Sequence, residues 1–277
     1  DNFHAVMIKR KKSSIGIIGG RGKTGGQCAR LLKAKGFPGT VTGNADAHRN
    51  AALIRNCDVV IFAVPLANAA KIIAKELRSA TRKDQLILDL SSLKEKETNA
   101  MLTAPGEVVG MHPLFGPGTD PAGQTMILCP ARCRKNTLAS LASVLQSCGL
   151  KTIVMTPNAH DGLMAVIQAV PHFKSLLMAD LLSSLKVNPR TITDVCTPTY
   201  ELEFNVIGRF LDDEPELYMP IIFGNPRMTG ILRRLRKLID AYLAIAQSRD
   251  IASASRRYRR LKKHFAPVTS RARIRSE

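Results

Sequence analysis

Three glycines near the start of the chain have the spacing of a dinucleotide-binding turn. Gly20, Gly22 and Gly25 form G-x-G-x-x-G directly after a β-branched run, and a segment of helical composition follows. In such a turn the first glycine permits a tight bend, the second lets the backbone approach a pyrophosphate, and the third lets the helix pack on the strand. Free N–H groups at the start of the helix then bind phosphate. We therefore predict a dinucleotide-binding turn, with a purely structural glycine turn as the alternative. A P-loop does not fit, because Ile17 stands where its first glycine is required.

The end of the second expected strand bears on the choice between NAD and NADP. An acidic residue there binds the ribose 2′-hydroxyl of NAD, whereas a basic environment suits the 2′-phosphate of NADP. The expected position, about Gly43, carries no carboxylate, and Asp46 comes three residues late. The residues alone leave both cofactors open. Four basic side chains are close enough in sequence to meet a phosphate: Arg21, Lys23, His48 and Arg49.

Two loops that follow buried strands carry residues suited to acid–base chemistry. Residues 89–94 read DLSSLK, and residues 110–117 read GMHPLFGP. Ligands of open α/β sheets bind outside the carboxyl ends of the strands, so both loops should face the cofactor. A hydroxyl from Ser92 near the imidazole of His112 would orient the ring and leave one nitrogen free for proton transfer. The alternative is that Ser92 caps a helix and His112 is a hydrogen-bonded loop residue.

A later segment places two histidines and a glutamine at helical spacing. His160, Met164, Gln168 and His172 share one helix face if the helix continues through Pro171, where a proline can kink a helix beside a cavity. Histidines on a mostly apolar helix also occur simply as core or surface residues.

Arg209 is an isolated cation on an apolar segment and needs an anion. A carboxylate bound through two hydrogen bonds is the natural partner. That carboxylate could belong to a substrate or to a structural residue such as Glu201 or Glu203.

Hydrophobic patterning predicts the elements that position these residues. Short apolar strands alternate with helices up to about residue 155, which predicts a parallel sheet covered on both faces, a Rossmann-type doubly wound α/β fold. Helical spacing then takes over, so we predict an all-helical second domain. The expected domains are residues 1–156 and 157–277. The expected strands are residues 14–18, 40–42, 59–64, 86–90, 108–111, 125–128 and 152–155, and the expected helices are 27–35, 51–56, 67–79, 137–148, 160–185, 198–211, 216–223 and 226–249.

Composition limits the class of protein. The chain has 277 residues, is 45% hydrophobic and carries a net charge of +19. The longest apolar run, residues 59–74, is interrupted by Pro65, Asn68 and Lys71, so no membrane span is expected.

The six cysteines form no CxxC pair and no Cys/His cluster, so we expect reduced thiols and no metal site. The charge and the basic C-terminus allow a nucleic-acid-binding protein as a distant alternative. An aromatic content of 5% without tryptophan, and the lack of a recognisable nucleic-acid motif, count against it.

Taken together and in this order, the motifs resemble the prephenate dehydrogenase family of tyrosine biosynthesis, in particular the dehydrogenase part of the bifunctional chorismate mutase/prephenate dehydrogenases. The resemblance spans roughly residues 14–240. It is carried by the glycine turn, by DLSSLK and GMHPLFGP, by HDxxMAxIQA at 160–169, and by GRF at 208–210 with ELY at 216–218.

The resemblance implies an NAD-dependent oxidative decarboxylation of prephenate to 4-hydroxyphenylpyruvate. His112 would take the proton of the substrate C4 hydroxyl as hydride leaves C4, and Ser92 would orient His112. Arg209 would bind a substrate carboxylate, while His172 and Gln168 would line the other side of the cleft. Arogenate dehydrogenase, which performs the same chemistry on a substrate with an amino group in place of the keto group, is the alternative.

The resemblance also implies a cofactor site, a partner and a location. NAD is expected, with NADP as the alternative because Gly43 stands where the bifunctional enzymes carry an acidic residue. The helical domain would form a homodimer, the substrate would be a small molecule, and the enzyme would be cytoplasmic, with neither a membrane nor a nucleic acid as partner. The expected cofactor contacts are Gly20, Arg21, Gly22, Lys23, Thr24, Gly25, Asn44, Val64, Pro65 and Ser91.

Overall fold

The computed structural model describes residues 13–43, 46–78 and 81–268. Its strands form one sheet in the order β2-β1-β3-β4-β5-β6-β7. The strand bounds are β1 Ile15–Ile18, β2 Gly39–Thr42, β3 Val59–Phe62, β4 Leu86–Asp89, β5 Glu107–Pro113, β6 Thr125–Arg132 and β7 Lys151–Val154.

The sheet is parallel from β2 through β5 and changes direction after β5. β6 runs antiparallel to β5, with His112 opposite Ile127, and β7 pairs parallel with β6. The doubly wound α/β fold is confirmed, but the expectation of a fully parallel sheet is wrong at this edge. The reason lies in the connection between β5 and β6, which contains no helix, because a parallel return needs a crossover of a dozen or more residues that is usually helical.

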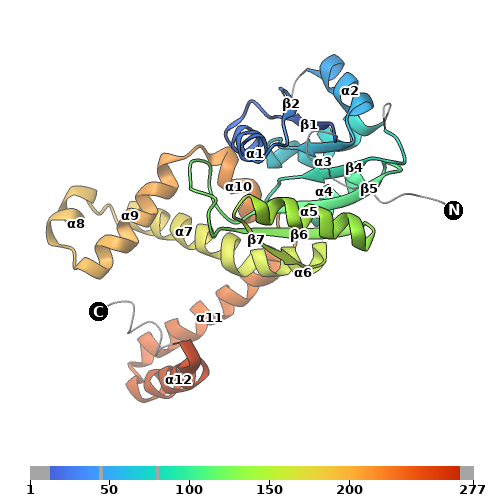
Figure 1. Cartoon of the computed structure of the whole chain (residues 1–277). Helices are drawn as coiled ribbons and strands as arrows, with labels where there is room; N and C mark the ends of the chain where they lie inside the picture. The colour runs from blue at the N-terminus through green and yellow to red at the C-terminus, as the bar shows by residue number, and fades with distance from the viewer. Residues whose placement is uncertain (1–12, 44–45, 79–80, 269–277) are drawn as a thin grey trace. The chain divides into compact units, whose positions relative to one another are not determined.

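Helices cover both faces of the sheet (Figure 1). Helices α1 (Lys23–Ala34) and α5 (Lys135–Ser147) pack on one face, where their leucines meet Ile15 and Ile17 of β1. Helices α2 (Ala47–Asn56), α3 (Ala69–Leu77) and α4 (Glu95–Met101) cover the other face, and a short 3-10 helix, η1 (Leu66–Asn68), precedes α3. Successive strand residues point to opposite faces, so the apolar strands supply two separate core layers.

The chain after β7 is helical. One continuous helix is built from α6 (Pro157–Met164), a π-helical turn η2 (Ala165–Ala169) and α7 (Val170–Ser184). The remaining helices are α8 (Pro189–Val195), α9 (Pro198–Asp212), α10 (Pro215–Gly224), α11 (Met228–Ser248) and α12 (Ile251–His264). Hydrophobic patterning did not predict the short helices α4 and α8, nor α12 in the basic C-terminal region.

By internal contacts the chain divides into two compact units, residues 1–228 and 229–277. Helices α6 to α10 therefore belong with the sheet. The expected division into residues 1–156 and 157–277 separates strands from helices and differs from this one.

The helix over residues 157–184 is long and apolar enough, by length and composition, to cross a membrane. The sequence shows no unbroken apolar run here, because polar residues are interspersed with the apolar ones. Leu177 and Leu181, among others, leave nearly half of their surface exposed. The helix thus leaves apolar surface exposed, while its first turn lies in the buried network described below.

Candidate active site

The glycine turn has the shape that a pyrophosphate requires. Gly19 has a φ of +78°, and a Cβ added at Gly25 would lie 2.5 Å from the carbonyl oxygen of Gly19. Helix α1 begins at Lys23 with Gly22 as its N-cap, so no side chain caps the helix, and its first turn contains no acidic residue. The N–H groups of this turn are therefore available to an anion, and the positive end of the helix dipole favours one. The turn fits a dinucleotide.

Several expected cofactor contacts lie along the same edge of the sheet, at the ends of β3 and β4. Val64 and Ser91 are buried, and Pro65 is exposed. The backbone N–H of Ser91 donates to Asp89 Oδ2 at 3.0 Å. Arg21 and Lys23 are exposed in the turn and Thr24 is half-buried, while Asn44 lies outside the described residues.

Asp46 does not replace the missing acidic residue after β2. It caps helix α2, accepting from the backbone N–H of Arg49 at 3.2 Å, and it pairs with the Arg49 side chain at 3.3 Å. A Cβ added at Gly43 would have nothing within 4 Å. The end of β2 thus offers open space and no carboxylate in the described part of the chain.

His112 is buried on β5 and bonded to a second histidine. Its Nδ1 lies 2.9 Å from Nε2 of His160 on α6. Helix α6 reaches this position because Met164, one turn after His160, packs on Ile127 and Cys129 of β6. No hydrogen bond joins Ser92 to His112 among the described residues, and Nδ1 of His112 is bonded to His160.

Asp161 anchors the other end of this histidine pair. Its Oδ1 lies 2.7 Å from Nδ1 of His160 and accepts from the N–H of Lys94 at 2.8 Å, while its Oδ2 accepts from the N–H of Glu95 at 3.0 Å. Burial alone would raise the pKa of Asp161, but the hydrogen bonds from His160 and from these two backbone N–H groups lower it below its ordinary value. Asp161 is therefore a carboxylate at neutral pH.

The pKa of His112 is lowered well below 6.5. Burial is the largest cause, followed by the charges of His160 and Lys94. His112 is therefore a neutral imidazole at neutral pH, the form that can accept a proton.

A fully buried ion pair lies beside the histidines. Lys94 Nζ is 2.6 Å from both oxygens of Asp89 and donates to the carbonyl of Met111 at 2.8 Å. Gly110 makes room for the lysine, because a Cβ there would lie 2.7 Å from Lys94 Cδ. Breaking such a pair by removing one partner leaves an uncompensated buried charge, so the pair holds the two loops in place.

The π-helical turn η2 lies between His160 and His172 and changes the direction in which the helix beyond it points its side chains. A π-turn inserts an extra residue per turn and rotates everything beyond it, and it lies just before Pro171, which lacks an N–H. His160 is fully buried against His112, whereas His172 is half-buried beside Phe210 and Tyr218, with ring centroids 6.1 and 4.5 Å apart. The two histidines thus lie in different surroundings, contrary to the expected shared face.

Gln168 lies inside the π-turn. Its Oε1 is buried and finds no hydrogen-bond partner in the described part of the chain. A buried carboxamide oxygen without a donor is costly, so this atom is suited to a ligand donor.

Arg209 is exposed in the last turn of α9 and forms no ion pair with a described acidic residue. The anticipated structural partner Glu203 instead pairs with Lys174 at 2.7 Å. Tyr218 donates to Asp213 at 2.9 Å and lies within the electrostatic influence of Arg209. Arg209 is therefore free to bind an anion.

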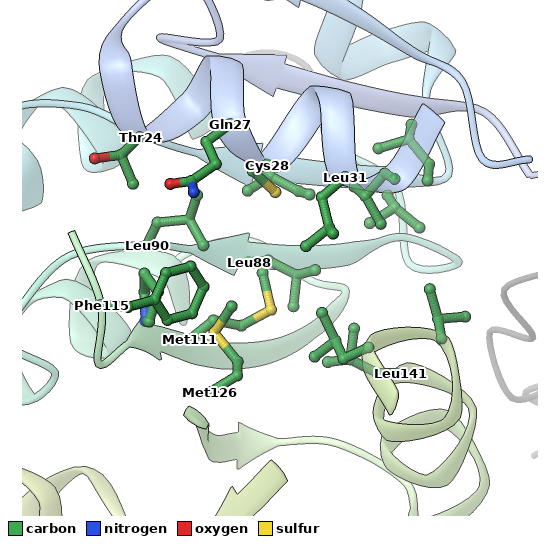
Figure 2. A pocket seen from close by; sticks show the side chains of 17 residues that line it. Thr24, Gln27, Cys28, Leu31, Leu88, Leu90, Met111, Phe115, Met126 and Leu141 are labelled. Atoms are coloured by element: carbon green, nitrogen blue, oxygen red, sulfur yellow. The ribbon is translucent and has the colours of Figure 1, made fainter. Parts of the chain in front are cut away.

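An apolar cavity lies under α1 on the other face of β5. Figure 2 shows Thr24, Gln27, Cys28 and Leu31 of α1 above Met111 and other apolar side chains of the sheet. Side chains alternate along a strand, so Met111 faces this cavity while the next residue, His112, faces helix α6. The cavity is thus separate from the histidine network.

Four buried polar residues of this network have no role predicted from the sequence. Two of them, Asp89 and Lys94, stand in the DLSSLK segment, and the other two form the His160-Asp161 pair. The adjacent histidine and aspartate were a usable signal, but their pairing with His112 depends on the docking of α6.

Two family domains match most of the chain. Residues 39–154 match the family domain described as "Prephenate dehydrogenase, nucleotide-binding domain", and residues 156–265 match "Prephenate dehydrogenase, dimerization domain". The glycine turn precedes the first match.

Two relatives and one solved structure are similar over most of the chain. A probable arogenate/prephenate dehydrogenase of Methanocaldococcus jannaschii is 31% identical over 95% of this chain, and a T-protein of Haemophilus influenzae is 31% identical over 90%. The chain spans 64% and 66% of the lengths of these two relatives. The prephenate dehydrogenase of A. aeolicus, solved with hydroxyphenyl propionate and NAD+, superposes with a TM-score of 0.71 at 19% identity, over 92% of this chain and 98% of that one. The two family domains together cover most of the residues, and the chain belongs to the prephenate dehydrogenase family.

Proposed function

We propose that this protein is a prephenate dehydrogenase that oxidatively decarboxylates prephenate to 4-hydroxyphenylpyruvate with NAD as cofactor. The observation that carries the proposal is a neutral, buried His112 whose Nδ1 is bonded to His160, at the end of the sheet where the glycine turn lies. Family membership supplies the substrate class. Arogenate is the second candidate substrate, because the Methanocaldococcus jannaschii relative carries both names.

The cofactor would lie along the carboxyl ends of β1, β3 and β4. The N–H groups at the start of α1 would bind the pyrophosphate, with the exposed Arg21 and Lys23 adding positive charge. Thr24, Val64, Pro65 and Ser91 would line the same edge. When bound, the nicotinamide accepts a hydride from C4 of the substrate.

NAD is proposed first because the A. aeolicus relative was solved with NAD+. The open, carboxylate-free end of β2 leaves space for a 2′-phosphate, so NADP turnover is part of the test below.

His112 would act as the general base. Its Nε2 would accept the proton of the C4 hydroxyl while C4 loses hydride, and loss of carbon dioxide from the ring then gives the aromatic product. Because aromatisation drives the reaction, the protein needs to position the substrate and move one proton.

The helical part of residues 1–228 would bind the substrate. Arg209 has no ion pair among the described residues and would bind a substrate carboxylate. Gln168 would accept a hydrogen bond at its unpartnered Oε1, and His172 would line the same side of the cleft. Ser92 is half-buried after β4 and would contact the substrate or nicotinamide rather than orient His112.

The second matched domain is described as a dimerization domain, and exposed apolar side chains are frequent along its helices. We propose a homodimer formed through these helices. The proposed enzyme would act in the cytoplasm, as expected for reduced cysteines and a small-molecule substrate.

The experiment is a turnover assay with four combinations, prephenate or arogenate with NAD or NADP, followed by the near-ultraviolet absorbance of the reduced nicotinamide. Turnover of prephenate with NAD is expected. His112→Asn should lower kcat by about 100-fold or more, the loss expected for a general base, while Arg209→Gln should mainly raise KM. No turnover of either substrate by folded wild-type protein, or a normal kcat in His112→Asn, would overturn the proposal.

A further inference from the structure

We propose that His160 and Asp161 are positioning residues that fix His112 in one tautomer, with the proton on Nδ1 and the lone pair on Nε2. This inference rests on the proposed function, since a general base must present a lone pair at its reacting nitrogen. It concerns two residues that lie outside the expected substrate and cofactor contacts.

Asp161 can only accept hydrogen bonds. Its side chain is 2% exposed, and both of its oxygens already accept from the backbone N–H groups that open helix α4, at 2.8 and 3.0 Å. Its backbone carbonyl is also fixed, because it accepts from Asn225 Nδ2 at 2.8 Å. The carboxylate is therefore immobile, ionised and unable to donate.

This carboxylate determines where His160 carries its proton. Nδ1 of His160 lies 2.7 Å from Asp161 Oδ1, so Nδ1 must be the donor. The side chain has no exposed surface, so water offers no alternative partner. In the neutral ring, Nε2 then bears the lone pair.

The proton position on His160 in turn determines that on His112. His160 Nε2 is an acceptor, so His112 Nδ1 must carry the proton that joins them at 2.9 Å. The rings meet edge to face, with planes 68° apart. Nε2 of neutral His112 is left as a lone pair, and no described residue donates to it. The carboxylate of Asp161 thus sets the reacting nitrogen through two intervening hydrogen bonds.

The opposite tautomer would block the reaction. With the proton on Nε2, His112 would donate to the substrate hydroxyl instead of accepting from it, and Nδ1 would face the lone pair of His160. The Asp161 charge also favours the imidazolium that forms when His112 takes the proton. Losing an orienting carboxylate in a comparable serine-histidine-aspartate site lowers kcat by about 10⁴-fold through the wrong tautomer.

The direct test is histidine NMR on the full chain labelled with ¹⁵N-histidine. Long-range ¹H–¹⁵N spectra distinguish the two tautomers, and His112→Asn and His160→Gln assign the two signals. We expect both His112 and His160 to carry the proton on Nδ1 in wild-type protein. Detection of His112 with its proton on Nε2 would overturn the proposal. The spectra can be recorded whether or not the protein turns over substrate.

Asp161→Asn tests the source of the tautomer. An amide has one acceptor oxygen, whereas the carboxylate has two. In one orientation of the amide, a backbone N–H of α4 loses its acceptor. In the other, the NH₂ group faces His160 and moves the His160 proton from Nδ1 to Nε2. We expect a kcat loss of about 100-fold or more with unchanged NAD binding and little change in KM. The matched control is Asp58→Asn, which alters a carboxylate that accepts from the Ser14 backbone and hydroxyl at 3.0 Å, on the exterior. Activity within about threefold of wild type in Asp161→Asn would overturn the proposal.

His160→Gln supplies a readout that a merely structural role would not move. Among the described residues, the positive charges that lower the pKa of His112 are that of His160, when it is protonated in acid, and that of Lys94. His160→Gln removes this charge of His160, so the pKa of His112 should rise. The acid limb of the kcat/KM profile should therefore shift to higher pH, and kcat should fall. A reduced kcat with an unshifted acid limb would show that His160 only supports the fold. If wild-type protein turns over neither substrate, the proposed function fails, whereas the NMR result still decides the tautomer.

Discussion

At the scale of single residues, the buried network contains a carboxyl group that has no evident use in the reaction. Glu97 on α4 is 3% exposed, and its Oε2 has no hydrogen-bond partner among the described residues. Burial is the main cause that raises its pKa from 4.5 to about 7, and the charge of Asp89 adds to it. The side chain is therefore largely protonated in the folded protein at mildly acidic pH.

This shift predicts a specific pH dependence of stability. Between pH 4.5 and about 7 the folded state keeps a proton that the unfolded chain has released, so the free energy of unfolding falls as pH rises through this window. The total loss is about 3 kcal/mol at 1.36 kcal/mol per pKa unit. Glu97→Gln cannot ionise, so its stability relative to wild type should increase between pH 5 and pH 8, measured by urea unfolding.

Glu201→Gln, an exposed substitution outside the buried network, serves as the control for this measurement. An equal pH dependence in wild type and Glu97→Gln would show that the carboxyl group ionises freely in the folded protein. The comparison cancels the opposite contribution of His112, whose lowered pKa costs stability as pH falls below 6.5.

At the scale of elements, the packing of α1 on the sheet depends on one glycine of the turn. A Cβ at Gly25 would lie 2.5 Å from the carbonyl of Gly19 and 2.9 Å from Cβ of Ala63. Neither atom can move without shifting the backbone of the turn or of the segment after β3. Gly25→Ala should therefore push the helix away from the cofactor edge.

We expect Gly25→Ala to lower the free energy of unfolding by about 1 to 3 kcal/mol, as overpacking does, and to weaken NAD binding measured by calorimetry. Gly26→Ala is the matched control, because its Cβ would lie 3.4 Å from the nearest atom and alanine favours the helix. Equal NAD affinity in the two variants would contradict this account of the turn.

At the scale of the whole molecule, the net charge of +19 is large for 277 residues. The proposed substrate, prephenate, and the dinucleotide cofactor are both anions, so a positive field should raise their association rates at low salt. We expect kcat/KM for prephenate to fall by up to about 10-fold as ionic strength rises from about 0.02 to 0.5 M. We expect kcat to change little. Stopped-flow binding of NADH at the same salt concentrations would separate association from chemistry. A kcat/KM that is insensitive to salt would rule out steering.

The sequence alone determined the architecture and the family. Short β-branched strands separated by helices identify a doubly wound sheet, because apolar residues repeat differently in strands and in helices. The glycine spacing identifies the turn, because only glycine tolerates such close backbone contacts. Gly20, His112 and Arg209 could be predicted as site residues from the sequence, since each belongs to a local motif.

Only the tertiary structure decided the partners of those residues. The antiparallel edge follows from the geometry of the β5–β6 connection, and the π-turn sends His160 and His172 to different neighbours although their spacing is helical. Hydrogen bonds between residues 48 or 67 positions apart, such as His112 to His160 and Lys94 to Asp161, have no local signature. They form because α6 docks on β6 through apolar contacts that carry no information about which polar groups will meet, and that docking brings His160 beside the proposed base.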